Sequence, residues 1–197
     1  MPGKTNLKPQ EMEAYWMPYT ANRAFKKAPR MMTGAAGHYY TTPDGRKIYD
    51  MFSGLWTSGI GHCHPKIVEA VQKQVATLDY GLTFQTSNEV SFQLADKLIK
   101  IAPEGFKHAF FTCSGSESVD TALKMALAWH KIGGESRTRL IGREKGYHGV
   151  NFGGLSVGGI PANRKMFAAN MIPGVDHLPH TLILEKNAFS RGQPQHG

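Results

Sequence analysis

The chain has 197 residues, which is within the usual range of about 50 to 250 residues for a single domain. Its 23 Lys and Arg against 15 Asp and Glu give a net charge of +8, which favours anionic partners such as phosphates, carboxylates or nucleic acid. The basic residues are scattered, with no run of five or six like charges, so we expect no nucleic-acid partner. No stretch reaches the roughly 18 apolar residues that a membrane span needs, so we expect no membrane partner.

The two cysteines, Cys63 and Cys113, are fifty positions apart and form no C-x-x-C pair. A disulfide scaffold and a zinc ribbon are therefore not indicated, and a reducing compartment fits best. Residues 1–8 contain no apolar core of a secretory signal. We expect a cytoplasmic protein.

The N-terminal quarter predicts an arm followed by a β-hairpin. Residues 11–30 are aromatic and basic and contain two prolines, which predicts a short helix in an irregular segment. Residues 38–42 and 46–52 are β-prone and flank a Pro-Asp-Gly turn at 43–45. Proline presets φ in such a turn and glycine tolerates a positive φ, so a hairpin is expected.

Two amphipathic helices are predicted next. Pro65 is placed where a first helical turn accepts proline, and residues 87–103 form a second helical stretch that ends at Pro103. The apolar residues with helical spacing are Ile67, Val68, Val71, Val75 and Leu78 in the first, and Val90, Leu94, Leu98 and Ile101 in the second.

The second half of the chain predicts an α/β core. Residues 107–113 are short and aromatic-rich, as in a strand; residues 119–127 have helical spacing; and residues 138–142 form a second plausible strand. Strand, helix and strand make a βαβ unit with a right-handed crossover. Beyond residue 149 glycines crowd together, and residues 189–197 are polar with no closing element, so we expect an incomplete large domain.

The loop Ser-Gly-Ser-Glu-Ser at 114–118 connects the predicted strand to the predicted helix. A helix N-terminus presents free N–H groups and the positive end of the helix dipole, and glycine lets a ligand approach the backbone, so a phosphate fits there. The alternative is a capping box without a ligand, with Ser114 as N-cap and Glu117 at N3. The loop alone leaves both possibilities open.

A second candidate segment, Tyr147-His148-Gly149, follows the second predicted strand. Ligand contacts in α/β sheets lie at the carboxyl ends of strands, and a tyrosine ring there could stack on a flat heteroaromatic group. An ordinary half-buried tyrosine would give the same pattern. No carboxylate partner can be assigned to His148 from the sequence, which weakens it as a general base.

Taken together, the two motifs resemble the phosphate loop and ring-stacking site of class III pyridoxal-phosphate (PLP) aminotransferases. The resemblance covers nearly the whole chain: Asp44-Gly45, Tyr49-Asp50-Met51 and His64-Pro65 are similar to the family's N-terminal hairpin and its entry into the large domain. Met17-Pro18-Tyr19-Thr20 and Gly54-Leu55-Trp56 resemble the omega-amino acid:pyruvate (beta-alanine:pyruvate) transaminases in particular.

The resemblance implies an α/β fold of PLP-transferase type I. Residues 1–52 would form the arm and hairpin, as part of the small domain, and residues 53–197 the first part of the PLP-binding large domain. It also implies that the protein moves an amino group from an omega-amino acid or amine to pyruvate, as a homodimer or tetramer when full length. The implied cofactor residues are Gly115, Ser116, Tyr147, His148 and Gly149, and the implied substrate residues are Tyr19, Trp56 and Phe84, with Phe84 reaching the neighbouring subunit's site.

The family's catalytic lysine and the acid that protonates the pyridine nitrogen have no counterpart that we can assign here. None of the six aspartates is followed by Glu, and Lys145 and Lys165 do not stand in the family's lysine context. We therefore assign no catalytic residue and expect the chain alone to be inactive. A non-catalytic fragment that binds the PLP phosphate, or that fails to fold, is the alternative.

Two other chemistries have weaker support. Gly154-Leu155-Ser156-Val157-Gly158 matches the G-x-S-x-G pattern of serine hydrolases, but Gly159 and Pro161 follow at once where a helix is needed. His62-Cys63-His64 offers three potential metal ligands, yet adjacent loop positions seldom converge on one metal, so we expect no metal site.

Overall fold

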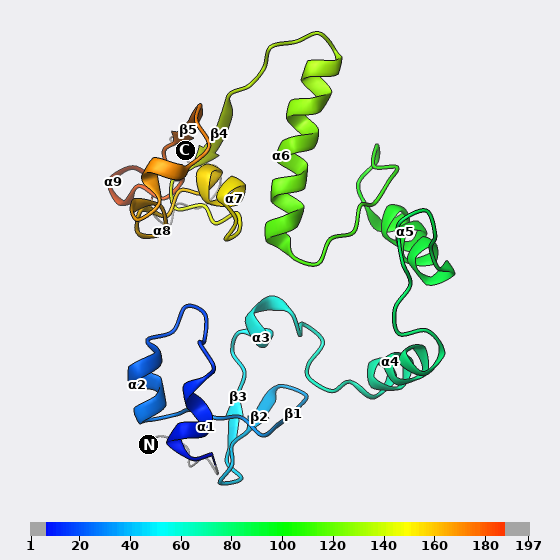
Figure 1. The fold of residues 1–197 in the computed structure, drawn as a ribbon, viewed down its shortest axis with the longest axis vertical. Helices are drawn as coiled ribbons and strands as arrows, with labels where there is room; N and C mark the ends of the chain where they lie inside the picture. Colours follow the sequence, from blue (N-terminus) through cyan, green and yellow to red (C-terminus); the bar gives the residue numbers. More distant parts are fainter. Residues whose placement is uncertain (1–6, 188–197) are drawn as a thin grey trace. The chain divides into compact units, whose positions relative to one another are not determined.

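The computed structural model describes residues 7–187, and its chain divides into two compact units, Met1–Ser91 and Phe92–Gly197 (Figure 1). Helices and strands occur in both units, in agreement with the predicted α/β class. The boundary that the sequence predicts, between residues 52 and 53, stays a prediction. Each unit is described by itself below.

The N-terminal unit begins with an arm and a small antiparallel sheet. Strand β2 pairs with both β1 and β3, with Tyr40 opposite Ile48 in the second pairing. The hairpin predicted around residues 43–45 is confirmed. The elements are α1 (Pro9–Glu13), α2 (Asn22–Lys27), β1 (Gly34–Ala36), β2 (Tyr39–Thr41) and β3 (Lys47–Tyr49).

Both predicted amphipathic helices are confirmed. Helix α4 (Pro65–Thr77) begins at Pro65, because proline's missing N–H has no partner in a first helical turn in any case. Helix α5 (Glu89–Ile101) ends before Pro103, which cannot continue a helix. The short element α3 (Ser53–Trp56) precedes them and has an unusual backbone, which is described with the site.

In the C-terminal unit a long helix is followed by a two-stranded parallel sheet. Strand β4 pairs with β5, with Leu140 opposite Val175, and α7 contacts both strands and α6. The elements are α6 (Gly115–Ile132), β4 (Leu140–Arg143), α7 (Phe152–Val157), α8 (Pro161–Lys165), the 3-10 helix η1 (Ala168–Asn170), β5 (Val175–Leu178) and α9 (Leu184–Asn187).

The prediction of a strand at residues 107–113 is wrong. No strand is assigned there, because a strand is defined by its hydrogen-bonded neighbour and none pairs with this segment within residues 7–187. The second predicted strand is real but lies at Leu140–Arg143 and pairs with Val175–Leu178. Along the chain, the two parallel strands β4 and β5 are therefore separated by α7, α8 and η1. No helix or strand was predicted for this stretch. The expected polar end at residues 189–197 lies outside the described residues.

Much apolar surface is exposed. Of the apolar side chains that the structure describes, only Met12 and Val157 are buried, while the apolar residues that recur with helical spacing on α4, such as Val71 and Val75, are exposed. No helix within the described part of the chain is long and apolar enough to cross a membrane.

Candidate functional site

The N-terminus of helix α6 has a side-chain cap and two free donors. The Glu117 N–H donates to Ser114 Oγ at 3.2 Å, and the Cys113 N–H donates to Glu117 Oε2 at 2.9 Å. Ser114 is therefore the N-cap, but the Glu117 carboxylate accepts from the residue before it, so the predicted capping box forms only in part. The cap leaves the N–H groups of Gly115 and Ser116 without an acceptor among residues 7–187, so capping does not use the donors that an anion would need.

The structure brings the two predicted cofactor motifs into contact. The Val150 N–H donates to Ser116 Oγ at 3.0 Å across 34 positions of sequence. Gly149 has a φ of +114°, and a Cβ atom on it would lie 2.8 Å from Ser116 Cα and 2.9 Å from Ser116 Oγ. Glycine is thus required at 149 both for its backbone conformation and for its close approach to Ser116.

Asp120, one helical turn after Ser116, makes a second link to the same segment. Its Oδ1 accepts the Gly154 N–H at 2.8 Å, and a Cβ on Gly153 would overlap its carboxylate. Residues four apart share a helix face, so one face of α6 fixes both ends of the segment 149–154. Asp120 was not predicted as a site residue; its spacing of four from Ser116 was the available signal.

The ring-stacking candidate is on this fixed segment. Tyr147 is 57% exposed, so its ring is open to a ligand. Tyr147, His148 and Gly149 line a narrow pocket together with Asn163 and Arg164. The buried Arg164 Nε has no hydrogen-bond partner in the described part of the chain, so the pocket wall contains an unsatisfied cationic donor.

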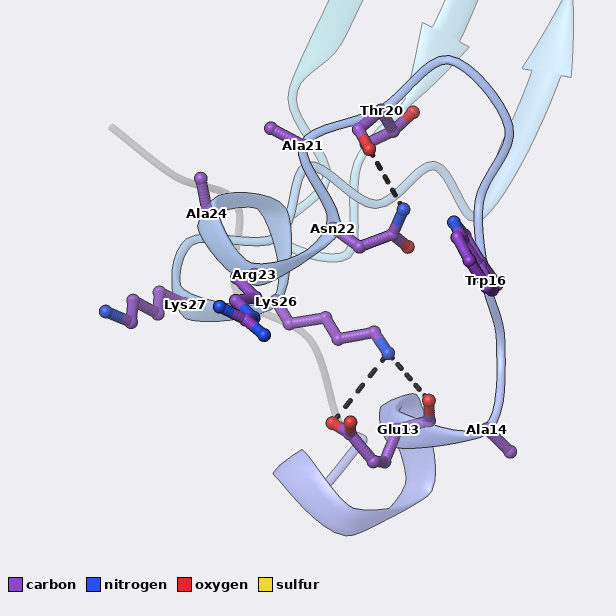
Figure 2. A pocket seen from close by; sticks show the side chains of 10 residues that line it. All are labelled: Glu13, Ala14, Trp16, Thr20, Ala21, Asn22, Arg23, Ala24, Lys26 and Lys27. Carbon is purple, nitrogen blue, oxygen red and sulfur yellow. Dashed lines mark hydrogen bonds and ion pairs between the residues drawn. The ribbon is translucent and has the colours of Figure 1, made fainter.

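In the N-terminal unit, Tyr19 is exposed on the loop between α1 and α2. Asn22 closes this loop, because its side chain accepts the Met17 N–H at 2.8 Å and donates to the Met17 carbonyl at 2.9 Å. Figure 2 shows the neighbouring open pocket of about 1010 Å³, in which Lys26 reaches back to the Glu13 carbonyl oxygen at 2.7 Å.

Trp56 is 80% exposed and ends a turn in which Ser53, Gly54, Leu55 and Trp56 all have positive φ, at 49°, 59°, 58° and 66°. The turn is held by Asp50, whose side chain is only 6% exposed. Asp50 Oδ2 lies 2.7 Å from His62 Nε2. Asp50 belongs to the Tyr49-Asp50-Met51 motif, but no role was predicted for it.

The electrostatics around Asp50 favour its charged form. Burial raises the pKa of Asp50, but the hydrogen bonds from His62, from the Phe52 and Gly54 N–H groups and from Tyr40 outweigh it, and the net pKa is lowered. Burial, followed by the charge and hydrogen bond of Asp50, raises the pKa of Tyr40. The carboxylate can therefore only accept, so His62 Nε2 is the donor of their bond.

Phe84, the third predicted substrate residue, is exposed in the segment between α4 and α5. No ring contact joins it to Tyr19 or Trp56 within residues 7–187. These three residues belong to the N-terminal unit, and the five predicted cofactor residues belong to the C-terminal unit.

The serine hydrolase alternative loses support. Ser156 is fully buried, donates to the Phe152 carbonyl at 2.6 Å and accepts the Ile172 N–H at 2.9 Å, so it is a structural residue of α7 rather than an accessible nucleophile. His62 is hydrogen-bonded to Asp50. In the part of the chain that the structure describes, no three His, Cys, Asp or Glu side chains gather as metal ligands.

The comparisons with known proteins agree with the resemblance. The family described as aminotransferase class-III matches residues 20–193. An omega-aminotransferase of Caulobacter vibrioides is 54% identical over 95% of this chain and 43% of its own length. An omega-amino acid–pyruvate aminotransferase of Pseudomonas putida is 50% identical over 95% of this chain and 41% of its own length.

Among solved structures, the omega transaminase of Pseudomonas jessenii in complex with PMP superposes with a TM-score of 0.83 at 28% identity, over 93% of this chain and 42% of that chain. The fold is therefore that of the PLP-dependent omega transaminases, as predicted. The chain belongs to the class III aminotransferase family. It spans less than half the length of these relatives.

Proposed function

We propose that this chain forms the phosphate- and ring-binding part of the PLP site in a transaminase that moves an amino group from an omega-amino acid to pyruvate. The observation that carries the proposal is the contact between Ser116 and the segment at Gly149, beside two unused backbone donors. The relatives, which are named as omega-amino acid–pyruvate and beta-alanine–pyruvate aminotransferases, support the substrate class.

The donors at α6 suit a phosphate dianion. The N–H groups of Gly115 and Ser116 would donate to phosphate oxygens, and the positive end of an 18-residue helix would stabilise the charge. The Ser116 oxygen already accepts the Val150 N–H, so its own hydroxyl proton is left to donate. Three donors then converge from one helical turn.

Tyr147 would stack on the pyridine ring of the cofactor, and Gly149 allows its segment to lie against Ser116. PLP, when bound, supplies the electron sink for amino-group transfer. The residues of this chain bind and orient the cofactor rather than move protons, since no catalytic residue is assigned in it. We further propose that the chain by itself does not transaminate.

We infer that Tyr19 and Trp56 line the amino-donor side of the site and that Phe84 reaches the neighbouring subunit of a homodimer or tetramer. All three side chains are exposed, as pocket-lining or interface groups are before a ligand or partner covers them. A solved omega transaminase variant in which glycine replaces a tryptophan was engineered for asymmetric synthesis of enantiopure bulky amines, which supports a tryptophan at such a pocket. A cytoplasmic location belongs to the same proposal.

The test is PLP binding by the full chain, followed by absorbance and by quenching of tryptophan fluorescence. We expect saturable binding of PLP and much weaker binding of pyridoxal, which lacks the phosphate. Ser116→Ala should weaken PLP binding roughly tenfold, because a hydrogen bond to a charged group contributes about 1.5 to 3 kcal/mol. Borohydride reduction of the same sample should trap no stoichiometric aldimine on one particular lysine of the chain.

The matched control is Ser118→Ala. Ser118 is on the same helix but about 200° around its axis from Ser116, and its hydroxyl is hydrogen-bonded to Thr112. This variant should bind PLP like the unmodified chain. Equal binding of PLP and pyridoxal, or equal losses in the two variants, would remove the phosphate site and the proposal with it.

A further inference from the structure

The turn that ends at Trp56 is energetically unfavourable on its own. Left-handed backbone is open to glycine, but it brings Cβ close to the following carbonyl oxygen in other residues, and three of the four residues with positive φ here, Ser53, Leu55 and Trp56, carry a Cβ. Three such residues within four positions persist only where surrounding contacts fix them. The structure identifies those contacts.

Asp50 provides the principal contacts. Its Oδ1 accepts the Phe52 N–H at 3.0 Å, and its Oδ2 accepts the Gly54 N–H at 2.7 Å. Both oxygens of one buried carboxylate therefore bind backbone donors at the start of the turn. Within the turn, the Trp56 N–H donates to the Phe52 carbonyl at 2.9 Å, which links Trp56 to the residue that Asp50 holds.

His62 braces the carboxylate from the other side. Its Nε2 is 2.7 Å from Asp50 Oδ2, and its ring packs on Tyr40 with centroids 4.5 Å apart. The backbone of His62 pairs with Gly37 in both directions, at 3.0 and 2.7 Å, which fixes the ring relative to the sheet. A Cβ on Gly54 would lie 3.5 Å from His62 Cε1, so the ring also lies against the turn.

We propose that Asp50 is a positioning residue for Trp56: its carboxylate, oriented by His62, fixes the left-handed turn that sets the direction of the indole. The consequence for catalysis rests on the proposed function, in which Trp56 lines the amino-donor pocket. Asp50 itself is buried and acts through the turn, without contact with the substrate.

Asparagine at position 50 gives a sharp test, because both carboxylate oxygens accept a backbone N–H. An amide can present only one oxygen, so in either orientation its NH₂ group faces the N–H of Phe52 or of Gly54. Asp50→Asn therefore removes one of the two fixing contacts while it keeps the size of the side chain. Leu55→Asn in the same background should restore the turn, since asparagine tolerates the left-handed region.

The measurement is ¹⁹F NMR of the full chain labelled with 5-fluorotryptophan. The chain has three tryptophans, Trp16, Trp56 and Trp129, and so gives three signals. The Trp56 signal is identified by its loss in Trp56→Phe. In Asp50→Asn we expect it to shift or broaden beyond detection while the other two stay in place, and in Asp50→Asn/Leu55→Asn we expect it to return. An unchanged Trp56 signal in Asp50→Asn overturns the proposal.

The matched control is Asp44→Asn, the same substitution in the same unit. Asp44 accepts from Thr42 and Arg46 in the hairpin turn, so all three signals should stay in place in this variant. If Asp50→Asn also loses the Trp16 signal, the unit has unfolded, and His62→Gln then carries the test. It removes the imidazole that orients the carboxylate, so the Trp56 signal should shift in it, and a signal that does not change overturns the proposal.

A kinetic measurement separates this inference from the proposed function. In the active holoenzyme, Asp50→Asn should lower kcat/KM for the amino donor roughly tenfold, as expected when one pocket contact is lost, with PLP affinity unchanged. If the full-length holoenzyme without substitutions does not transaminate, the proposed function fails, and the NMR result on this chain still decides the role of Asp50. A normal kcat/KM despite a displaced Trp56 signal would exclude the catalytic consequence.

Discussion

Two oxygen acceptors, Asp50 in the N-terminal unit and Ser116 in the C-terminal unit, solve a similar problem with different chemistry. Each accepts backbone N–H groups from a loop that it holds in place. The Asp50 carboxylate is buried and accepts from two backbone groups and from His62. The Ser116 hydroxyl accepts from one backbone group and keeps its own proton.

The difference indicates which loop is ready for a ligand. The hydrogen bonds of Asp50 are used within the protein, so it serves only to fix a conformation. Ser116 and the two free N–H groups beside it have donors left over, so this acceptor both fixes a loop and can bind an anion. A fixed loop and a ligand site thus differ in the number of unused donors.

Among the variants that test this comparison, Gly149→Val should have the largest effect on the free energy of unfolding. The new Cβ would meet Ser116 at 2.8 Å on a backbone with φ of +114°, so strain and overpacking add. We expect a loss of about 2 to 4 kcal/mol in the free energy of unfolding, measured by urea denaturation, together with loss of PLP binding.

Gly115→Ala is the control for Gly149→Val, because Gly115 is in the same candidate site but has room for a Cβ. A Cβ at Gly115 meets nothing within 4 Å, and the residue is helical, so alanine should raise the free energy of unfolding by about 0.5 to 1 kcal/mol. Equal stability of the two variants would show that the contact between Gly149 and Ser116 does not hold the segment.

The dependence of stability on pH tests the Asp50 side of the comparison. The pKa of Asp50 is lowered in the folded chain, so its contribution to stability is fully present above the unfolded value of about 3.9 and is lost as the pH falls through the lower folded value. The difference in unfolding free energy between the unmodified chain and Asp50→Asn should therefore shrink between pH 5 and 2. A constant difference over that interval would contradict the assigned ionisation.

Asp176→Asn should have the smallest effect on the free energy of unfolding. Its comparison with Asp50→Asn shows how much burial adds to the contribution of a carboxylate. The Asp176 carboxylate also accepts two hydrogen bonds, both from Arg139, and their hydrogen bonding and charge raise the pKa of Arg139. The two side chains are 69% and 53% exposed. We expect the smallest loss in unfolding free energy among these variants in urea denaturation, and a still smaller one in 1 M salt. A larger loss would show that solvent exposure does not reduce the contribution of the Asp176 carboxylate to stability.

Local sequence signals predicted the helices of this fold well, and they predicted pairing between distant segments poorly. Helices α4 and α5 follow from apolar spacing and proline, both of which act within a few residues. The segment 107–113 has strand composition but no paired neighbour within residues 7–187. Helix α7 was missed because its glycines hide the helical pattern; a Cβ on Gly153 or Gly154 would overlap Asp120 or the His148 carbonyl.

The candidate site was predictable in part. The resemblance supplied Ser116 and Gly149, and their contact accords with a shared site. The supporting roles of Asp50 and Asp120 depend on hydrogen bonds to backbone groups of other segments, and side-chain identity does not reveal which N–H will face a carboxylate. The cofactor and substrate roles of the predicted site residues stay predictions.

The position of Ser116 has a consequence for the loop that it holds. A hydroxyl that donates to an anion becomes more polarised, and its oxygen is then a stronger acceptor. Anion binding at the helix end would therefore strengthen the bond from the Val150 N–H and make local opening of the segment at Gly149 rarer. Through one oxygen atom, occupancy of the phosphate position would be transmitted to a loop 34 residues away in the sequence.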